Sequence, residues 1–144
     1  MSTETRSPHS HSNTHFLSNI QPIFLIMFDF EKLHVYQKAK AFHLQVIRWI
    51  AAQPRLDRVT QDQLRRASMS VALNIAEGTG RFSPKDRRNF YVIARSSAFE
   101  VAAIFDILKA DGRVVQADFE RFYLEADEVS RMLFAMVKQL EVGG

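Results

Sequence analysis

The chain has 144 residues, of which 47% are hydrophobic and 24% are charged, with a formal net charge of +3 and no cysteine. This length fits a single domain with an apolar core, and the absence of Cys excludes disulfides, thiolate metal sites and a cysteine nucleophile. No apolar run approaches the roughly 20 residues needed to cross a bilayer. We therefore expect a globular, cytoplasmic protein.

Residues 1–26 are rich in Ser, Thr, Asn and His and show no helical periodicity. The organised pattern begins just after them, at MFDFEKL. We expect 1–26 to be a disordered N-terminal extension and 27–144 to be the folded domain, with Met27 as a possible alternative start of translation.

The first two helices follow from apolar residues spaced three and four apart. The first stripe begins at Leu33 and ends near Gln53–Pro54; its members are Leu33, Tyr36, Ala39, Phe42, Val46, Trp49 and Ile50. A second helix should begin near Asp57 or Thr60, because Thr60 and Gln63 have capping-box spacing. It should run to Gly78, which we expect to end the helix in a left-handed conformation.

Two longer helices follow, joined by short loops. Ser83, Pro84 and Asp86 predict a strong helix start, with Ser83 as the cap and Pro84 in the first turn. The third helix then carries Phe90, Ile93, Ala94, Ala98, Val101, Ile104, Phe105 and Leu108, and the fourth carries Phe119, Phe122, Ala126, Val129, Leu133, Met136 and Leu140. Short loops place consecutive helices antiparallel, so the expected fold is an all-α, up-down four-helix bundle.

Candidate catalytic and metal-binding residues do not form a convincing set. Glu31 and His34 give one partial Glu-x-x-His match at a helix end, and His43 lies on the opposite side of that helix. The GTGR sequence at 78–81 lacks the lysine of a phosphate loop and follows a helix where a strand is required. We expect no enzyme activity, no cofactor and no bound metal.

Asn74 and Glu77 interrupt the apolar stripe of the second helix. A buried amide needs hydrogen-bond partners, and an acid at the negative end of a helix needs a cation or donor. We expect Asn74 and Glu77 to form a structural polar network with the loop and the third helix. Arg81, Arg88 or Arg95 could supply the cation, and we expect Arg95 to do so. The alternative is that this corner contacts a partner molecule.

Three stretches carry a family resemblance: FEKLHVYQKA, QLRRASMSVALNIAEGTGR and FYVIARSSAFE. They resemble, in order and spacing, the signature blocks of the 23S ribosomal-RNA intervening-sequence protein family, also called four-helix bundle proteins. The resemblance implies a bacterial homo-oligomer, with a pentameric ring as the first expectation, and no assigned activity. One similar protein, the accessory variability determinant of diversity-generating retroelements, binds nucleic acid and a reverse transcriptase through a basic surface.

Charge is distributed unevenly along the chain. Residues 55–95 carry nine basic and four acidic side chains, whereas residues 96–144 carry five basic and nine acidic ones. The simplest interpretation of this distribution is that the charges lie on solvated helix faces. The sharper ones are phosphate binding by Arg81, Lys85, Arg87 and Arg88, and contact between the basic segment and the acidic half of a neighbouring subunit. Phe82, beside these bases, either stacks on an unpaired base or covers the end of the bundle.

Together these features predict a non-enzymatic homo-oligomeric adaptor that associates with RNA or DNA and does not bind membranes. A protein-binding scaffold with no nucleic-acid role is the alternative.

Overall fold

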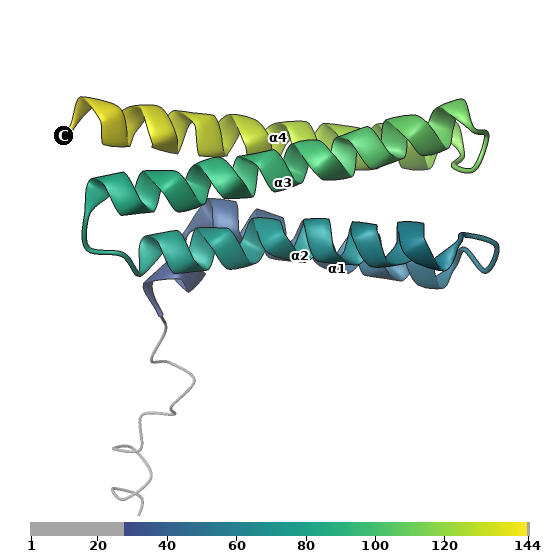
Figure 1. Ribbon diagram of the computed structural model, residues 1–144, viewed down its shortest axis with the longest axis horizontal. Coiled ribbons are helices and arrows are strands. Elements are labelled where there is room, and N and C mark those ends of the chain that lie inside the picture. The colour runs from purple at the N-terminus through teal and green to yellow at the C-terminus, as the bar shows by residue number, and fades with distance from the viewer. Residues whose placement is uncertain (1–27, 144) are drawn as a thin grey trace, which may run out of the picture.

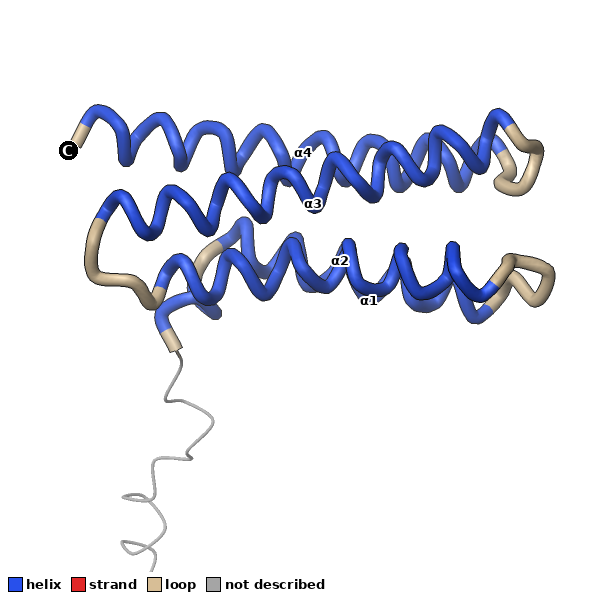
Figure 2. Tube along the Cα trace, viewed as in Figure 1, coloured by secondary structure: helices blue, strands red, loops and turns tan. Residues whose placement is uncertain are grey.

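The computed structural model describes residues 28–143, which fold into a bundle of four α-helices preceded by a short 3-10 helix. The elements are η3 (Asp29–Lys32), α1 (His34–Ala51), α2 (Arg58–Thr79), α3 (Pro84–Ala110) and α4 (Gln116–Val142). The described part of the chain contains no strand (Figure 2). The α1–α2 and α3–α4 loops lie at one end of the bundle and the α2–α3 loop at the other (Figure 1). The expected N-terminal extension, 1–26, lies outside the described residues.

Capping side chains set the starts of α2 and α3. The carboxylate of Asp57 accepts a hydrogen bond from the backbone N–H of Thr60 at 2.9 Å, so Asp57, and not Thr60, caps α2. This hydrogen bond, together with those from the Thr60 hydroxyl and from Arg113, lowers the pKa of Asp57 to about 2. At α3, Ser83 accepts from the N–H of Asp86 at 3.1 Å and Pro84 occupies the first turn, as the sequence predicts.

The core has two halves that differ in residue type. Towards the α1–α2 loop it is aromatic: Phe105 stacks on Phe122 with ring centroids 4.6 Å apart, and Trp49 packs edge-on against Phe105 at 5.1 Å. Towards η3 the core is built mainly from small and aliphatic side chains. Most predicted core positions are buried, but Ile93 was wrongly assigned and is 48% exposed. The buried residues around it, Tyr91, Ala94 and Ser97, show that the stripe on α3 is rotated away from Ile93.

One histidine is part of the core. His43 Nδ1 lies 2.7 Å from the hydroxyl oxygen of Ser68, joining α1 to α2 in a buried contact. Burial lowers the pKa of His43, because desolvation penalises the charged imidazolium. His43 is therefore a neutral packing residue, held in place by Ser68.

Gly78 brings α2 and α3 into close contact. The residue is buried inside α2, which continues to Thr79 and is capped by Gly80 at a φ of −79°. The expected left-handed Gly78 is therefore wrong, and in the described residues only Gly112 has a positive φ, of 69°. A Cβ on Gly78 would lie 2.8 Å from the Cβ of Phe90 and 2.9 Å from the Tyr91 ring. Glycine is needed here for space and not for backbone conformation.

A chain of hydrogen bonds joins α2 to α3 one to two turns before Gly78. The side-chain amide of Asn74 donates to the Ser70 carbonyl at 2.8 Å and to the Ser70 hydroxyl at 2.9 Å. Ser70 Oγ lies 2.9 Å from Ser97 Oγ, and the Ser97 hydroxyl donates to the Ile93 carbonyl at 3.1 Å. Asn74 is thus the first donor in a polar contact between the two helices.

Replacing Gly78 by alanine should destabilise the protein even though alanine favours helix by about 1 kcal/mol. The new methyl group would overlap Phe90 Cβ, which cannot rotate away, so we expect a net loss on the order of 1–3 kcal/mol. Chemical denaturation measures this loss. The control is Gly80→Ala, where the nearest atom would lie at an ordinary 3.6 Å; equal stability of the two variants would contradict the close-contact explanation.

Replacing Asn74 by leucine should reduce the free energy of unfolding by about 1 kcal/mol, since it removes the partly buried hydrogen bonds to the Ser70 carbonyl and hydroxyl. Thermal unfolding of Asn74→Leu beside Asn89→Leu, the same change at an exposed position of α3, measures the effect. A higher melting temperature for Asn74→Leu would show that the amide does not stabilise the α2–α3 contact.

Candidate nucleic-acid interface

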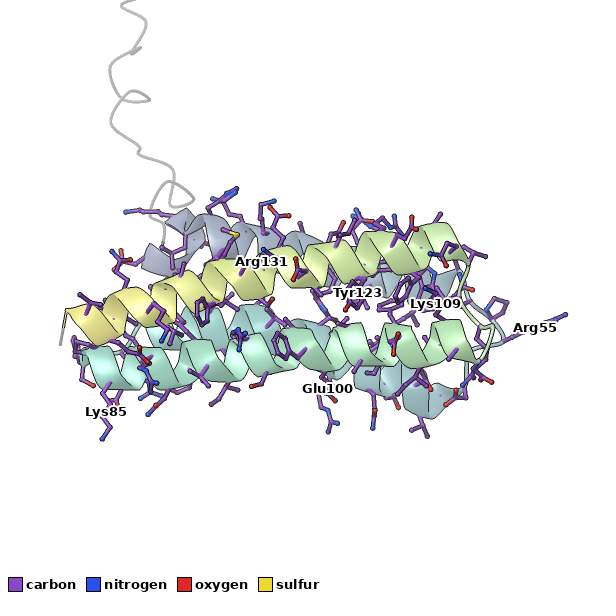
Figure 3. The ribbon with its side chains drawn as sticks, turned by 90° about the horizontal axis from the view of Figure 1, so that it is seen from above. Arg55, Lys85, Glu100, Lys109, Tyr123 and Arg131 are labelled. Carbon is purple, nitrogen blue, oxygen red and sulfur yellow. The ribbon has the colours of Figure 1, made fainter. Side chains whose placement is uncertain are left out.

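The basic residues predicted to bind phosphate gather where α2 ends and α3 begins. Arg81 lies in the α2–α3 loop, and Lys85, Arg87 and Arg88 lie in the first two turns of α3. The Ser83 cap and Pro84 start α3 immediately after the loop, which keeps the four side chains at one end of the bundle. Lys85 points away from the helices into solvent (Figure 3).

These four residues differ in what holds them. Arg88 donates twice to one Glu141 oxygen, at 2.8 and 3.0 Å, and this contact lowers the pKa of Glu141. Arg87 Nε donates to the Arg81 carbonyl at 2.7 Å, and the Arg81 guanidinium lies 4.7 Å from the centre of the Phe90 ring. Arg88 is therefore already neutralised within the chain, whereas the exposed Arg81 and Lys85 and the half-buried Arg87 form a basic corner.

Phe82 stands at the tip of this corner. Its side chain is fully exposed, with a relative accessibility of 101%. The interpretation of Phe82 as a lid over the bundle end is therefore wrong, because a lid would bury its ring against the helices. A free aromatic ring beside basic side chains can stack on a nucleobase while the bases bind the phosphates.

The structure does not join Asn74, Glu77 and Arg95 in one polar network. Asn74 bonds to Ser70, whereas Glu77 is exposed and makes no hydrogen bond or ion pair with any described residue. The Arg95 guanidinium lies over Phe99 at 4.5 Å and near Phe134 at 5.4 Å, on the side of α3 that packs against α4. Its Nε is buried and has no hydrogen-bond partner among residues 28–143. Glu77 and Arg95 lie on different faces, which separates them within one chain.

A groove between α3 and α4 was not predicted. It has a volume of about 420 Å³, small residues on its floor, and Phe99, Tyr123, Asp106 and Asp127 at its edges. Tyr123 lies over the gap between the two helices, whereas Glu100 points away on the other side of α3 (Figure 3). The sequence signal is the set of alanines and one serine on facing helix sides, Ala98, Ala102, Ala103, Ala126 and Ser130.

A smaller hollow lies between α1 and α4. Burial raises the pKa of Glu125, and Lys38 forms an ion pair with Glu128 at 2.6 Å. The volume of about 260 Å³ is below the range of roughly 300–1,000 Å³ that is typical of small-molecule sites, so we assign it no reaction.

Metal-ligating side chains do not gather in residues 28–143: no three of His, Asp and Glu are placed to share an ion. His34 is exposed on the first turn of α1, and His43 is held by Ser68. None of the four helices has an apolar stretch long enough to span a membrane.

Comparison with known proteins agrees with the fold. The chain is similar to the crystal structure of a protein of unknown function from the S23 ribosomal protein family of Bacteroides thetaiotaomicron, with a TM-score of 0.69 and 21% identity. The match covers 72% of this chain and 98% of the other one. No curated protein matches the chain. The model of the 23S rRNA-intervening sequence protein family matches residues 31–135. With that match over most of its length, and with the helices and signature segments described above, the chain belongs to the 23S rRNA-intervening sequence protein family.

Proposed function

We propose that this protein is a non-enzymatic, homo-oligomeric adaptor of the bacterial cytoplasm that associates with RNA or DNA. Its subunit would be an antiparallel up-down four-helix bundle, and its assembly a closed ring, with five subunits as the first expectation. The observation that carries the nucleic-acid role is the fully exposed Phe82 among Arg81, Lys85 and Arg87.

The chemistry of this corner favours nucleic acid over a small anion. Three cations, two of them exposed, can neutralise successive phosphates, and the aromatic ring offers a flat surface that any base can stack on. Asp86 lies in the same helical turn and reduces the local positive charge. A single corner should therefore bind weakly, and a ring that repeats it would bind more tightly through multivalency.

Changing Lys85, Arg87 and Arg88 together to glutamine should weaken binding of RNA and DNA and flatten its dependence on salt. Counterion release makes the wild-type affinity fall steeply between about 50 and 200 mM salt, and fewer phosphate contacts reduce that slope. Fluorescence anisotropy with a labelled RNA measures both quantities. Arg88→Gln alone should change little, because Glu141 already neutralises that residue.

The matched control is the triple glutamine variant of Arg55, Arg58 and Arg65, which removes the same charge from the other end of α2. Equal losses in the two triple variants would mean that only net charge matters. A wild-type protein that retards no RNA or DNA at low salt would rule out the proposed function.

Replacing Phe82 by alanine should weaken binding to single-stranded RNA while leaving duplex binding and the salt slope unchanged. Base stacking on an aromatic ring contributes about 1–3 kcal/mol, and Phe82 carries no charge. Val115→Ala, at an exposed apolar residue of the opposite end, is the control. Equal effects on single strands and duplexes would contradict stacking.

A protein-binding scaffold is the second candidate function. It is favoured by the groove between α3 and α4, whose aromatic and acidic edges suit another polypeptide better than a phosphate backbone. Failure of nucleic-acid binding, with assembly intact, would favour this candidate.

A further inference from the structure

Two pairs of opposite charges lie on separate surfaces of the described part of the chain. Arg66 and Glu77 are exposed on α2, while Arg95 and Asp106 lie on α3 beside the groove. None of the four forms an ion pair with any residue between 28 and 143. Isolated charges are common on protein surfaces. The spacing and the neighbours of these four residues are therefore what indicates a contact with a partner.

The α2 pair belongs to one outward-facing line of residues, the α2 stripe, formed by Arg66, Met69, Leu73 and Glu77. Steps of three, four and four residues place them on one face of the helix. Met69 is 45% exposed and Leu73 is 53% exposed, although both are large apolar side chains. The stripe therefore presents two apolar residues between a cation and an anion.

The α3 pair brackets the groove in the same way. Arg95 lies beyond one end, with its guanidinium oriented by Phe99 and Phe134, and Asp106 lies at the other end. Between them lie Phe99, 51% exposed, and Tyr123, 45% exposed, over a floor of alanines. This surface is mainly apolar in the middle with an anion and a cation at its ends, and the second acid at its edge, Asp127, is already paired with Arg131 at 2.8 Å.

The two surfaces match in length. Glu77 lies eleven positions after Arg66, and Asp106 lies eleven positions after Arg95, which is three helical turns or about 16 Å in each case. If α2 of one copy runs opposite to α3 of another, Arg66 meets Asp106 and Glu77 meets Arg95. Met69 and Leu73 then cover Phe99, Tyr123 and the floor of the groove. In a parallel arrangement like charges would meet, so the charges select one direction.

We propose that the α2 stripe of one copy docks into the α3–α4 groove of a second copy, with α2 antiparallel to the α3 that it contacts. The stripe and the groove are different surfaces of the subunit, so each copy uses one to bind the copy before it and the other to bind the copy after it. Such head-to-tail contacts close into a ring when the rotation between copies permits. This interface rests on the self-association in the proposed function and specifies its contacts.

Charge reversal tests the pairing in the full-length protein. Arg66→Glu and Asp106→Arg each place like charges opposite one another, and neither residue has an ion-pair partner within the described chain to lose. Each variant should associate at least about tenfold more weakly than wild type in analytical ultracentrifugation. The double variant should recover association, because its altered stripe meets an oppositely altered groove. A mixture of the two single variants should recover it in part, because the two variants must alternate and a ring of five retains one contact between like charges.

Matched controls carry the same charge changes away from the interface. Arg55 lies in the α1–α2 loop, and Glu100 points away from α4 (Figure 3). The variants Arg55→Glu and Glu100→Arg should therefore assemble as the wild type does. Circular dichroism checks that every variant keeps its helical content. Glu77→Arg combined with Arg95→Glu repeats the test at the other end of the groove.

Three results would overturn the interface: a monomeric wild type across the micromolar range, unchanged association of both single variants, or no recovery in the double variant and the mixture. RNA retardation on the same samples separates this proposal from the nucleic-acid role. If association changes as expected in the variants but the wild type binds no RNA, only the nucleic-acid role is ruled out. If the protein binds RNA and its association is unchanged by these substitutions, only the proposed interface is ruled out.

Discussion

The close contact between α2 and α3 at Gly78 is the constraint that shapes the surface around the α2–α3 loop. With no side chain at this position, α2 continues to Thr79 while Phe90 and Tyr91 lie directly against it. Thr79 adds a hydrogen bond between its hydroxyl and that of Tyr91 at 2.8 Å. Only residues 80–83 then connect the two helices, so the loop is too short to fold back over the bundle. Arg81 and Phe82 are held in solvent beside Lys85 and Arg87 as a consequence.

The same contact decides which face of α2 is free. Ser70 bonds to Ser97 of α3 and accepts from the Asn74 amide, while Leu64, Val71 and Ile75 fill the core. Met69, Leu73 and Glu77 are left on the outside. Two large apolar side chains exposed on one line of a helix lose the free energy of burial, on the order of 1.5–3 kcal/mol per side chain when fully buried. A second protein surface is one way to recover it.

Several surface charges form ion pairs that connect elements of one chain. Arg113 holds Asp57 at 2.9 Å and Asp111 at 2.7 Å, which ties the start of α2 to the α3–α4 loop. Arg88 holds Glu141 and ties the start of α3 to the end of α4. These pairs connect elements of one chain and are already satisfied. Among the residues without such pairs in the described chain, we propose partners for Lys85, Arg66 and Asp106.

Much of the helical plan could be predicted from local signals. Ser83, Pro84 and Asp86 fix the start of α3 because their hydrogen bonds and backbone geometry involve only neighbouring residues. Regular spacing of Phe119, Phe122, Ala126, Val129 and Leu133 likewise identifies the buried face of α4. Ile93 was assigned wrongly because the apolar residues on α3 form a band wider than its buried stripe, and spacing alone does not show where a partner helix lies.

The amino-acid sequence by itself determined the four α-helices, the cap of α3, the family and the clustering of basic residues around residues 81–88, since these follow from periodicity and from residues close in the chain. Only the tertiary structure decided that Gly78 is needed for space, that Phe82 is exposed, that Glu141 engages Arg88, and that Glu77 and Arg95 lie apart. Each of these depends on distances between residues that are separated along the chain or on solvent exposure. The physical reason is that periodicity records which side of a helix is apolar, whereas the packing of several helices decides which atoms come within contact and which remain in water.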